Sequence, residues 1–521
     1  MAVSREELLA RVRARDRAWD VIVIGGGATG VGIAIDAAAR DYDTLLLEQS
    51  DFGKGTSSRS TKLIHGGVRY LQQGNIPLVM EALRERGILR NNAPHLVHDM
   101  PFVVPNYQWW EAPFYGLGMR VYDALAGKYG FGPSRNLSKE ETIARLPTIE
   151  TDGLRGGVIY HDGQFDDARL LIHMVLTAAA QGATVLNYVR VTGLEKSDDG
   201  YVTGVTARDI ETGEEFSASA SVVINATGVF ADAIRRMDDP AARPVIQPSQ
   251  GVHVVLERAF LPGDSAIMVP HTDDGRVLFA IPWHDRVLIG TTDTPVQTAS
   301  LEPRAFDEEI DFLLEHAARY LTRDPNRADV LSVFAGLRPL VAADEASTAA
   351  LSREHTVLVA RSGLVTIAGG KWTTYRRMAE DAVDYAATLG GLEPRPCVTR
   401  QLNIHGYHTH AEDFGALAHY GADAPEVERL LRSDPAHDVL LHPRLANRTG
   451  EVVWAVREEM ARTVDDVLAR RTHALLLDAR AAIEAAPRTA RIMATELGRD
   501  ARWVKAQVDS FAEIAQRYVA S

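Results

Sequence analysis

The sequence predicts an α/β protein with three parts: an open sheet covered by helices, a second part built on an antiparallel sheet, and a helical C-terminal part. Residues 20–47 have the pattern of a strand, a glycine turn, a helix and a second strand. Residues 244–300 are rich in strand patterns separated by turn sequences such as DDGR at 273–276. After Pro394 and Pro396, alanine, arginine, glutamate and leucine recur at helical spacing through residue 521.

Length and composition are those of an ordinary globular protein. The chain has 521 residues, which is too many for one simple core, so we expect two or three domains. A net charge of −14 argues against a nucleic-acid partner, because a general nucleic-acid binder shows a basic face. An anionic ligand would need a pocket lined by cationic side chains, because the negative net charge of the chain repels anions.

The cellular location is expected to be the cytoplasm. Cys397 is the one cysteine, so it cannot form a disulfide within the chain, as suits a reducing compartment. No run of eighteen uncharged apolar residues is present, and residues 1–20 are too charged for a secretory signal.

The first unit along the chain is a βαβ pattern. We expect a short strand over Val21–Ile24, a helix over Ala28–Arg40 and a buried second strand over Thr44–Leu47. The sequence DVIVIGGGATG at 20–30 contains G-x-G-x-x-G directly after the first strand, and Glu48 closes the second strand. A glycine triplet in this context, followed by a terminal acid, is typical of a Rossmann-like dinucleotide site.

Each position of the glycine pattern has a physical reason. Gly25 permits the tight turn, and Gly27 lets the backbone approach a pyrophosphate at the helix N-terminus. Gly30 lets the helix pack close to the strand, and Glu48 would accept a hydrogen bond from a ribose hydroxyl. The pattern alone does not separate a nicotinamide from a flavin dinucleotide.

Two later segments favour a flavin. SVVINATGVFAD at 221–232 is a buried strand that ends in an open loop, and LVTIAGGKWTTYRRMAE at 364–380 is a strand, a glycine pair and a helix. The helix N-terminus near 369–373 would present a positive dipole end to an anion. A reduced flavin carries such charge, whereas a nicotinamide gains none. An ordinary turn at this position is the alternative.

The stretch TSSRSTKLIHGGVRYL at 56–71 collects hydroxyl, glycine and cationic residues in an acidic chain. Its hydroxyl groups and backbone would face the phosphates and ring edges of the cofactor, and the glycine pair at 66–67 would let the backbone pass close to the ring. The cationic side chain that follows, Arg69, would then reach the substrate. One segment serves both sites because hydride transfer requires a close approach of the reacting atoms.

Together these segments resemble the FAD-dependent, respiratory glycerol-3-phosphate dehydrogenases. The resemblance spans about residues 20–380 and includes FDDARLL (165–171), INATGVFAD (224–232), IPWHDRVLIGTTDT (281–294), AGLRPL (335–340) and AGGKWTTYR (368–376). It implies oxidation of sn-glycerol 3-phosphate to dihydroxyacetone phosphate, with electrons passing through FAD to a membrane quinone. Arg59 stands where the family pattern often has a small residue, from which we expect a change in solvent exposure only.

The resemblance also implies a domain division. Residues 18–72, 161–237 and 333–388 would form the FAD-binding domain, residues 73–160 and 238–332 the substrate-binding domain, and residues 389–521 a helical cap.

Substrate and catalytic roles follow from the same resemblance and from the chemistry of a phosphorylated alcohol. The planar fork of arginine bonds two phosphate oxygens at once. The residues placed toward the substrate are Arg69, Tyr70, Arg338, Arg353 and Lys371, and the catalytic candidates are His253, Arg338 and Lys371. His253 is the candidate base, although a core histidine satisfied by hydrogen bonds fits its apolar strand equally well. In that case Lys371 would stabilise the alkoxide, and water or an arginine would receive the proton.

The residues assigned to the cofactor come from four segments of the chain. They are Gly25, Gly27, Ala28, Thr29, Gly30 and Glu48, then Thr56, Ser57, Ser58, Ser60, Lys62, Leu63, His65 and Gly66, then Ala226, Thr227 and Gly228, and finally Gly370, Lys371 and Thr373.

Three competing functions stay open at this point. They are a flavin oxidase that uses oxygen on glycerol phosphate or an amino acid, a flavin-binding scaffold without catalysis, and a nicotinamide dehydrogenase. A quinone acceptor would require a membrane surface, for which the aromatic stretch at 107–130, with Trp109 and Trp110, is the candidate. Burial of that stretch against another domain or subunit is the alternative. We expect a homodimer, with the helical tail as a cap or as the dimer contact.

Overall fold

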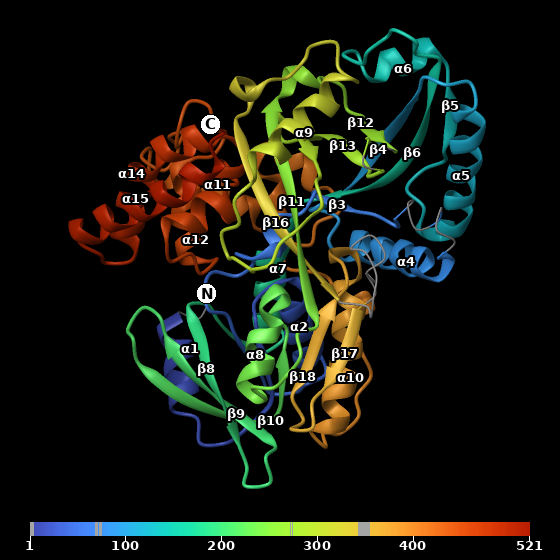
Figure 1. Ribbon diagram of the computed structural model, residues 1–521. Coiled ribbons are helices and arrows are strands. Elements are labelled where there is room, and N and C mark those ends of the chain that lie inside the picture. Colours follow the sequence, from blue (N-terminus) through green and yellow to red (C-terminus); the bar gives the residue numbers. More distant parts are fainter. Residues whose placement is uncertain are drawn as a thin grey trace.

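The computed structural model describes residues 5–67, 71, 75–270, 272–273, 275–341 and 355–520. Three residues expected to face the substrate, Arg69, Tyr70 and Arg353, lie outside the described residues. Two sheets and a group of C-terminal helices make up the molecule (Figure 1).

The first sheet has the order β17–β18–β10–β1–β2–β7, and its central strands are parallel, as a dinucleotide fold requires. Strand β9 extends it by pairing antiparallel with β10, and β8 pairs antiparallel with β9. Its strands are β1 (Trp19–Ile24), β2 (Thr44–Leu47), β7 (Thr184–Leu186), β8 (Val189–Lys196), β9 (Val202–Asp209), β10 (Glu215–Asn225), β17 (His355–Val359) and β18 (Val365–Gly369).

Helices α7 and α10 both pack against α2 beside this sheet, and the apolar residues of the three helices form one core with β1, β2 and β10. Close packing of α2 depends on glycine, because a side chain at Gly30 would overlap the carbonyl oxygen of Gly25. The helices of this body are α1 (Arg5–Arg13), α2 (Ala28–Ala39), α7 (Asp167–Ala180), α8 (Ala231–Asp238) and α10 (Tyr375–Leu389). The predicted βαβ unit at the start of the chain is confirmed to within two residues.

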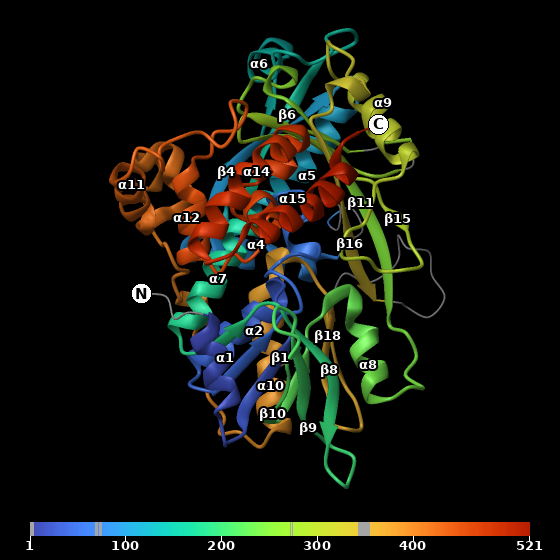
Figure 2. The ribbon, with the colours of Figure 1, turned by 90° about the vertical axis from the view of Figure 1, so that its left-hand side faces the viewer.

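The second sheet is mainly antiparallel, with the order β15–β11–β14–β13–β12–β4–β6–β3. Strand β16 pairs with β11 along most of its length, and this long pair runs down toward the first body (Figures 1 and 2). The strands are β3 (Leu63–Ile64), β4 (Val97–Asn106), β5 (Arg135–Leu137), β6 (Gly156–Phe165), β11 (Ile246–Glu257), β12 (Ala266–Val269), β13 (Leu278–Trp283), β14 (Arg286–Gly290), β15 (Thr294–Pro295) and β16 (Ser332–Val341).

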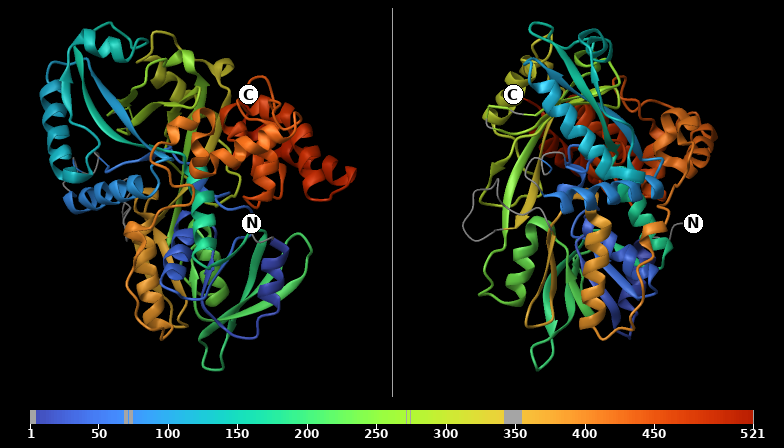
Figure 3. Two further views of the ribbon diagram at one scale, coloured as in Figure 1. Left: turned by 180° about the vertical axis from the view of Figure 1, so that it is seen from behind. Right: turned by 90° about the vertical axis from the view of Figure 1, so that its right-hand side faces the viewer.

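Helices α4 and α5 contact each other and lie at the outer edge of this second body, where Figures 1 and 3 both show them opposite the C-terminal helices. The helices here are α4 (Ile76–Asn92), α5 (Glu111–Ala126), α6 (Lys139–Arg145) and α9 (Asp307–Ala318).

The C-terminal part is helical, as predicted, and shares an apolar core with the second sheet. Its helices are α11 (Ala424–Ser433), α12 (Thr449–Arg457), α13 (Ala474–Leu477), α14 (Ala479–Glu496) and α15 (Ala501–Ala515). Within the described part of the chain, every helix is too short or too polar to cross a membrane. The fold class is therefore confirmed, while the exact domain boundaries stay a prediction.

Candidate active site

A cavity of about 730 Å³ lies where the two sheets meet. One side is formed by the loops that follow β1, β10 and β18, at the carboxyl ends of the parallel strands, and the other by β11, β13 and β16. Ligands of open α/β sheets bind in the crevice at these carboxyl ends. The cavity is also within the size range of small-molecule sites.

The end of the cavity near the first sheet has the features of a nucleotide site. Gly25 has φ +109°, and a side chain there would come within 2.7 Å of the carbonyl oxygen of Ala226. Glu48 accepts the backbone N–H groups of Gly26 at 2.7 Å and Ser50 at 2.8 Å. Burial raises the pKa of Glu48. Its carboxylate is thus held in place and, through its remaining lone pairs, can accept hydrogen bonds from hydroxyl groups.

The segment 56–61 crosses from the first sheet to the second. Thr56 Oγ1 donates to the carbonyl oxygen of Leu337 at 2.6 Å, and Thr61 Oγ1 lies 2.9 Å from His253 Nε2. On its other side, the indole N–H of Trp372 donates to the carbonyl oxygen of Ser57 at 2.8 Å. The segment is therefore fixed by both bodies and forms a wall of the cavity.

The β11–β16 pair brings two predicted catalytic residues to one face. Residues directly opposite in an antiparallel pair share a face, and so do residues two apart along a strand. Arg338 is opposite Ser249, the next rung on that face pairs Gly336 with Gly251, and the rung after it pairs Phe334 with His253. A pair of glycines therefore separates Arg338 from His253.

Arg338 extends over Gly251, where any side chain would overlap its guanidinium group. It donates to Thr291 Oγ1 at 3.1 Å, to the carbonyl oxygen of Thr292 at 3.0 Å and to Asp293 Oδ1 at 3.0 Å. These contacts fix the direction of its planar fork, as recognition of a phosphate or carboxylate requires.

His253 is buried and its ring stacks on Phe334, with ring centroids 4.9 Å apart. Burial lowers the pKa of His253 well below 6.5, and the charges of Arg338 and Lys62 lower it further. Within the described residues its Nδ1 makes no hydrogen bond. The imidazole is thus neutral at neutral pH and has a lone pair that can accept a proton.

Lys371 enters the cavity from the turn after β18. Gly369 and Gly370 have φ of +75° and +79°, which glycine adopts without strain, and a short 3₁₀ turn, Trp372–Thr374, then leads into α10. Lys371 and Thr373 both line the cavity. The predicted strand, glycine pair and helix are confirmed here.

The structure brings most of the predicted site residues to this cavity. Those that line it are Gly25, Gly27, Ala28, Thr29, Glu48, Thr56, Ser57, Ser60, Leu63, His65, Ala226, Thr227, Gly228, His253, Arg338, Gly370, Lys371 and Thr373.

Four other predicted cofactor residues lie behind the wall. Gly30 packs on Gly25, and Ser58 Oγ donates to the carbonyl oxygen of Gly53 at 2.8 Å. Lys62 is fully buried, and its ammonium group lies 2.7 Å from the carboxylate of Asp167. Gly66 packs on Leu83 and Tyr122, with its N–H donating to Tyr122 Oη at 2.8 Å. The packing of Gly30 on Gly25 agrees with the role that the glycine pattern predicts for it. Lys62 and Gly66 are held away from the cavity by partners distant in the chain, Asp167 and Tyr122, which no local pattern predicts.

Sequence reasoning gave no role to several lining residues. The stretch IGTTDT at 289–294 belongs to the resemblance, yet only the structure places Thr291 and Asp293 on Arg338. Arg276 and an apolar wall were also missed. The apolar wall consists of Phe102, Tyr160, Met268 and Phe279.

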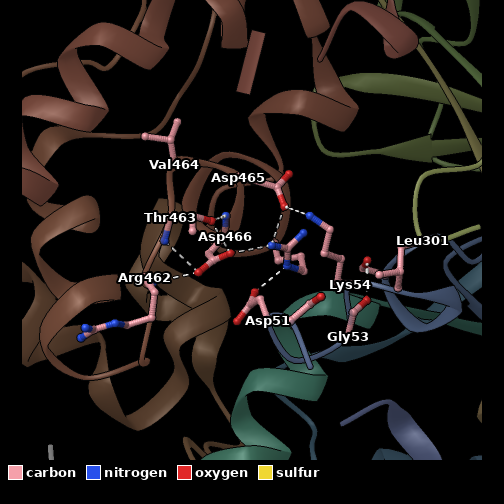
Figure 4. Close-up of polar contacts among 12 residues, drawn as sticks. Asp51, Gly53, Lys54, Leu301, Arg462, Thr463, Val464, Asp465 and Asp466 are labelled. Carbon is pink, nitrogen blue, oxygen red and sulfur yellow. Dashed lines mark hydrogen bonds and ion pairs between the residues drawn. The ribbon is translucent and has the colours of Figure 1, made fainter. Parts of the chain in front are cut away.

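The C-terminal part holds the cavity wall through a buried ionic network, which Figure 4 shows in part. Lys54 Nζ lies 2.9 Å from Asp465, and Arg471 lies 2.6 Å from Asp51. Burial alone would raise the pKa of Asp51, but the charges of Arg471 and Arg470 outweigh it and hold this pKa below its ordinary value. The network fixes the loop that precedes Thr56.

Arg59 belongs to the same junction. It is 7% exposed, and its guanidinium group donates to Glu302 at 2.6 Å and to Tyr518 Oη at 3.0 Å. A change in solvent exposure alone therefore does not describe its role, because it joins the cavity wall to the end of the chain.

Comparison with known proteins identifies the family. A profile described as "FAD dependent oxidoreductase" matches residues 20–376, and one described as "C-terminal domain of alpha-glycerophosphate oxidase" matches residues 365–504. The chain is 41% identical to a protein of Caenorhabditis elegans named probable glycerol-3-phosphate dehydrogenase, mitochondrial, over 99% of this chain and 75% of that one. It is also 41% identical to human mitochondrial glycerol-3-phosphate dehydrogenase, over 92% and 71%. The chain belongs to the FAD-dependent glycerol-3-phosphate dehydrogenase family.

Solved structures agree with this assignment. A glycerol-3-phosphate dehydrogenase from Bacillus halodurans, complexed with FAD, matches with a TM-score of 0.80 and 29% identity over 99% of this chain and 97% of that one. An L-α-glycerophosphate oxidase from Mycoplasma pneumoniae, with FAD bound, shares the fold with a TM-score of 0.57 and 18% identity, over 74% of this chain and 99% of that one.

The cavity fits the cofactor of this family. Gly228 and Gly55 line it, and a side chain at either position would meet no atom within 4 Å, so the space beside them is open to a ligand. Glu48 offers a fixed acceptor at the ribose end, and the backbone at Gly27 opens α2 toward a pyrophosphate. These observations fit the nucleotide half of a bound dinucleotide.

Proposed function

We propose that the protein oxidises sn-glycerol 3-phosphate to dihydroxyacetone phosphate in this cavity. The observation that carries the proposal is the placement of a fixed guanidinium group, Arg338, and a neutral imidazole, His253, on one face of a sheet that borders a dinucleotide cavity. Relatives named glycerol-3-phosphate dehydrogenase, about 40% identical over nearly the whole chain, support the same substrate.

Bound FAD supplies a ring that accepts two electrons as a hydride. The residues proposed to hold its nucleotide half are those around Gly25, Glu48 and Ser57, and those proposed to border its ring are Thr61, His253 and the turn at 369–373. The apolar side chains beside the cavity exclude water from the ring, which strengthens every charge interaction there.

Substrate binding is proposed to depend on cations. Arg338 is held by Thr291 and Asp293 so that its fork is fixed before a dianion arrives. Lys371 adds a point charge from the opposite body. Arg69, Tyr70 and Arg353 stay proposed substrate contacts.

The proton of the substrate hydroxyl is proposed to pass to His253. Its ring is fixed by Phe334 and Thr61, and its lowered pKa keeps it unprotonated before substrate binds. A bound phosphate would offset the nearby positive charges and so raise this pKa, which strengthens the base when it is needed. Lys371 as the stabiliser of the alkoxide is the alternative assignment.

A quinone is the proposed electron acceptor, and a membrane surface its source. Helix α5 carries exposed apolar side chains one helical turn apart, with exposed fractions of 44% at Trp110, 55% at Phe114, 68% at Leu117 and 43% at Val121. We call this set, together with Trp109, the α5 stripe; Trp109 is 75% exposed. Such a stripe suits the interfacial region of a bilayer. We accordingly propose a cytoplasmic protein that docks on the membrane, and a homodimer.

An oxidase is the second candidate, because the C-terminal residues match a profile described for alpha-glycerophosphate oxidase. The two candidates differ in how the reduced enzyme is reoxidised. We expect enzyme reduced by substrate to be reoxidised by a soluble quinone analogue at least about a hundredfold faster than by dissolved oxygen. Equal rates, or faster reoxidation by oxygen, would establish the oxidase.

A substrate panel with a dye acceptor tests the proposed activity. Glycerol 3-phosphate should reduce the dye, whereas glycerol, glycine and L-proline should not, because they lack the phosphate that Arg338 and Lys371 would bind. Turnover of glycine or proline that exceeds turnover of glycerol 3-phosphate would reject the proposal.

A further inference from the structure

Three metal-ligand side chains converge outside the cavity. Asp166 precedes α7 in the first body, His284 lies in the turn between β13 and β14, and His473 precedes α13 in the C-terminal part. Their ligand atoms all lie within 4.8 Å of one another. Each of the three large parts of the molecule therefore contributes one side chain, and none of these lines the cavity.

The separations suit a small tetrahedral metal. His473 Nε2 lies 2.9 Å from Asp166 Oδ1, and His284 Nε2 lies 3.9 Å from Asp166 Oδ2. Zinc bonds to nitrogen and oxygen are about 2.0–2.1 Å, which places neighbouring ligands of a tetrahedral site about 3.3 Å apart. The two observed separations lie on either side of that value.

His473 is a buried side chain held close to the carboxylate of Asp166. This residue is 4% exposed, and its Nε2 makes no hydrogen bond within the described part of the chain, although the carboxylate of Asp166 is so close. A nitrogen and a carboxylate oxygen at this distance can pair directly, and two ligands of one metal ion also lie about this far apart. Asp166 is itself fixed, because it accepts the N–H of Arg169 at 3.0 Å at the start of α7.

We propose that Asp166, His284 and His473 bind a divalent transition-metal ion, Zn²⁺ first of all. Imidazole with carboxylate favours zinc and its neighbours, whereas magnesium and calcium prefer an all-oxygen set. His284 is exposed on its outer side, which gives the ion a path from solvent and leaves a fourth position for water.

The site would connect three parts of the molecule at one point. Asp166 is followed by Asp167, whose carboxylate accepts from Ser60 Oγ at 2.7 Å and lies 2.7 Å from Lys62 Nζ. Ser60 lines the cavity, so an ion at Asp166 would stiffen the wall next to the reaction site. We therefore expect the ion to stabilise the holoenzyme rather than to take part in its chemistry.

Equilibrium dialysis of the FAD-loaded, chelator-treated protein against Zn²⁺, with metal counted by mass spectrometry, tests the site. We expect about one ion per chain for the wild type and loss of that ion in His284→Asn, in which asparagine tolerates the φ of +49° at this position. The matched control is His161→Asn, which removes a histidine that lies 3.0 Å from Asp99 and, among the described residues, belongs to no group of three metal-ligand side chains.

Two further readouts separate a real site from adventitious binding. Zn²⁺ should raise the melting temperature of the wild type and of His161→Asn, and leave that of His284→Asn unchanged. Co²⁺ should give the red-region absorption bands of a tetrahedral centre in the wild type. These bands should be absent from His284→Asn. Equal uptake by the wild type and His284→Asn, or no uptake by the wild type, would overturn the proposal.

Discussion

Gly251 controls the position of Arg338. It lies in strand β11 with ordinary backbone angles. Because it has no side chain, the guanidinium group of Arg338 can lie directly against it. We expect Gly251→Ala to displace that group and lower kcat/KM for glycerol 3-phosphate about a hundredfold, since a displacement of about 1 Å costs that much in well-aligned sites.

FAD content should stay unchanged in Gly251→Ala, because Gly251 is distant in sequence and sheet from the glycine turn of the nucleotide end. Gly118→Ala is the control, since a side chain there meets no atom within 4 Å. Unaltered kinetics in Gly251→Ala, measured at saturating dye, would remove Arg338 from the binding step.

The lowered pKa of His253 determines how kcat/KM should depend on pH. Its pKa lies well below 6.5 in the free protein, so it stays unprotonated as the pH falls through 6.5. We expect kcat/KM to be flat from pH 8 down through 6.5 and to fall only at lower pH, where the base becomes protonated.

Replacement of the base by His253→Asn should lower kcat by about 10²–10⁴-fold. The acid limb of the pH profile should vanish with it. A turnover within a few-fold of the wild type, with an unshifted profile, would assign the proton to another group, with Lys371 as the alternative.

Side chains with local patterns were predictable, and those with distant partners were not. Glu48 lines the cavity, as expected of an acid at the end of the second strand, which has a fixed relation to the glycine turn; its contact with the cofactor stays a prediction. Arg59 could not be understood from sequence, since Tyr518, which it contacts, is 459 positions away. Lys62 was expected at the cofactor, but Asp167 holds it inside the wall.

The loop at 51–54 and the turn Asp466–Arg471 form one ionic unit. Asp51 is fully buried between Arg470 and Arg471. Its replacement leaves Arg470 with Asp465 and Asp466, but Arg471 keeps only the more distant carboxylate of Glu459, at 3.8 Å, among the described residues. We expect Asp51→Asn to lower the free energy of local unfolding of 466–477 by about 3–5 kcal/mol, as measured by native-state hydrogen exchange. Asp438→Asn, which breaks an exposed pair with Arg448, should cost about 1 kcal/mol or less.

The same unit should respond to acid. The pKa of Asp51 is lower in the folded protein than its ordinary value of 3.8, so its contribution to stability is complete above pH 3.8. That contribution is lost as the pH falls through the folded pKa. Protection of 466–477 in the wild type should therefore hold between pH 5 and 8 and fall below about pH 4, and the corresponding acid dependence should be weaker in Asp51→Asn.

Strand and helix limits in the first unit followed from sequence periodicity, because β1, α2 and β2 are local patterns. The pairing of β11 with β16 did not follow. It joins residues such as Gly251 and Gly336 that are far apart in the chain, and register depends on both strands at once. The face shared by Arg338 and His253 is therefore a result of the structure.

Helix α5, which carries the exposed apolar residues of the α5 stripe, lies on the side of the molecule away from the C-terminal helices (Figures 1 and 3). If the α5 stripe docks on a bilayer, Trp109→Ser/Trp110→Ser should reduce sedimentation with anionic vesicles at least about tenfold, since burying each indole contributes more than about 1.4 kcal/mol. The control is Tyr201→Ser, which removes a side chain that is 58% exposed in the turn between β8 and β9. Equal partition of the two variants would assign the stripe to another contact, such as the expected second subunit.

The central claim is that a flavin and a phosphate-binding guanidinium group share one cavity formed by both sheets. Its most direct test is the visible spectrum of the purified, FAD-loaded protein under anaerobic titration with sn-glycerol 3-phosphate. We expect stoichiometric loss of the flavin absorbance in the wild type and slow, incomplete loss in Arg338→Ala with the same flavin content. A wild-type spectrum that glycerol 3-phosphate leaves unchanged would contradict the central claim.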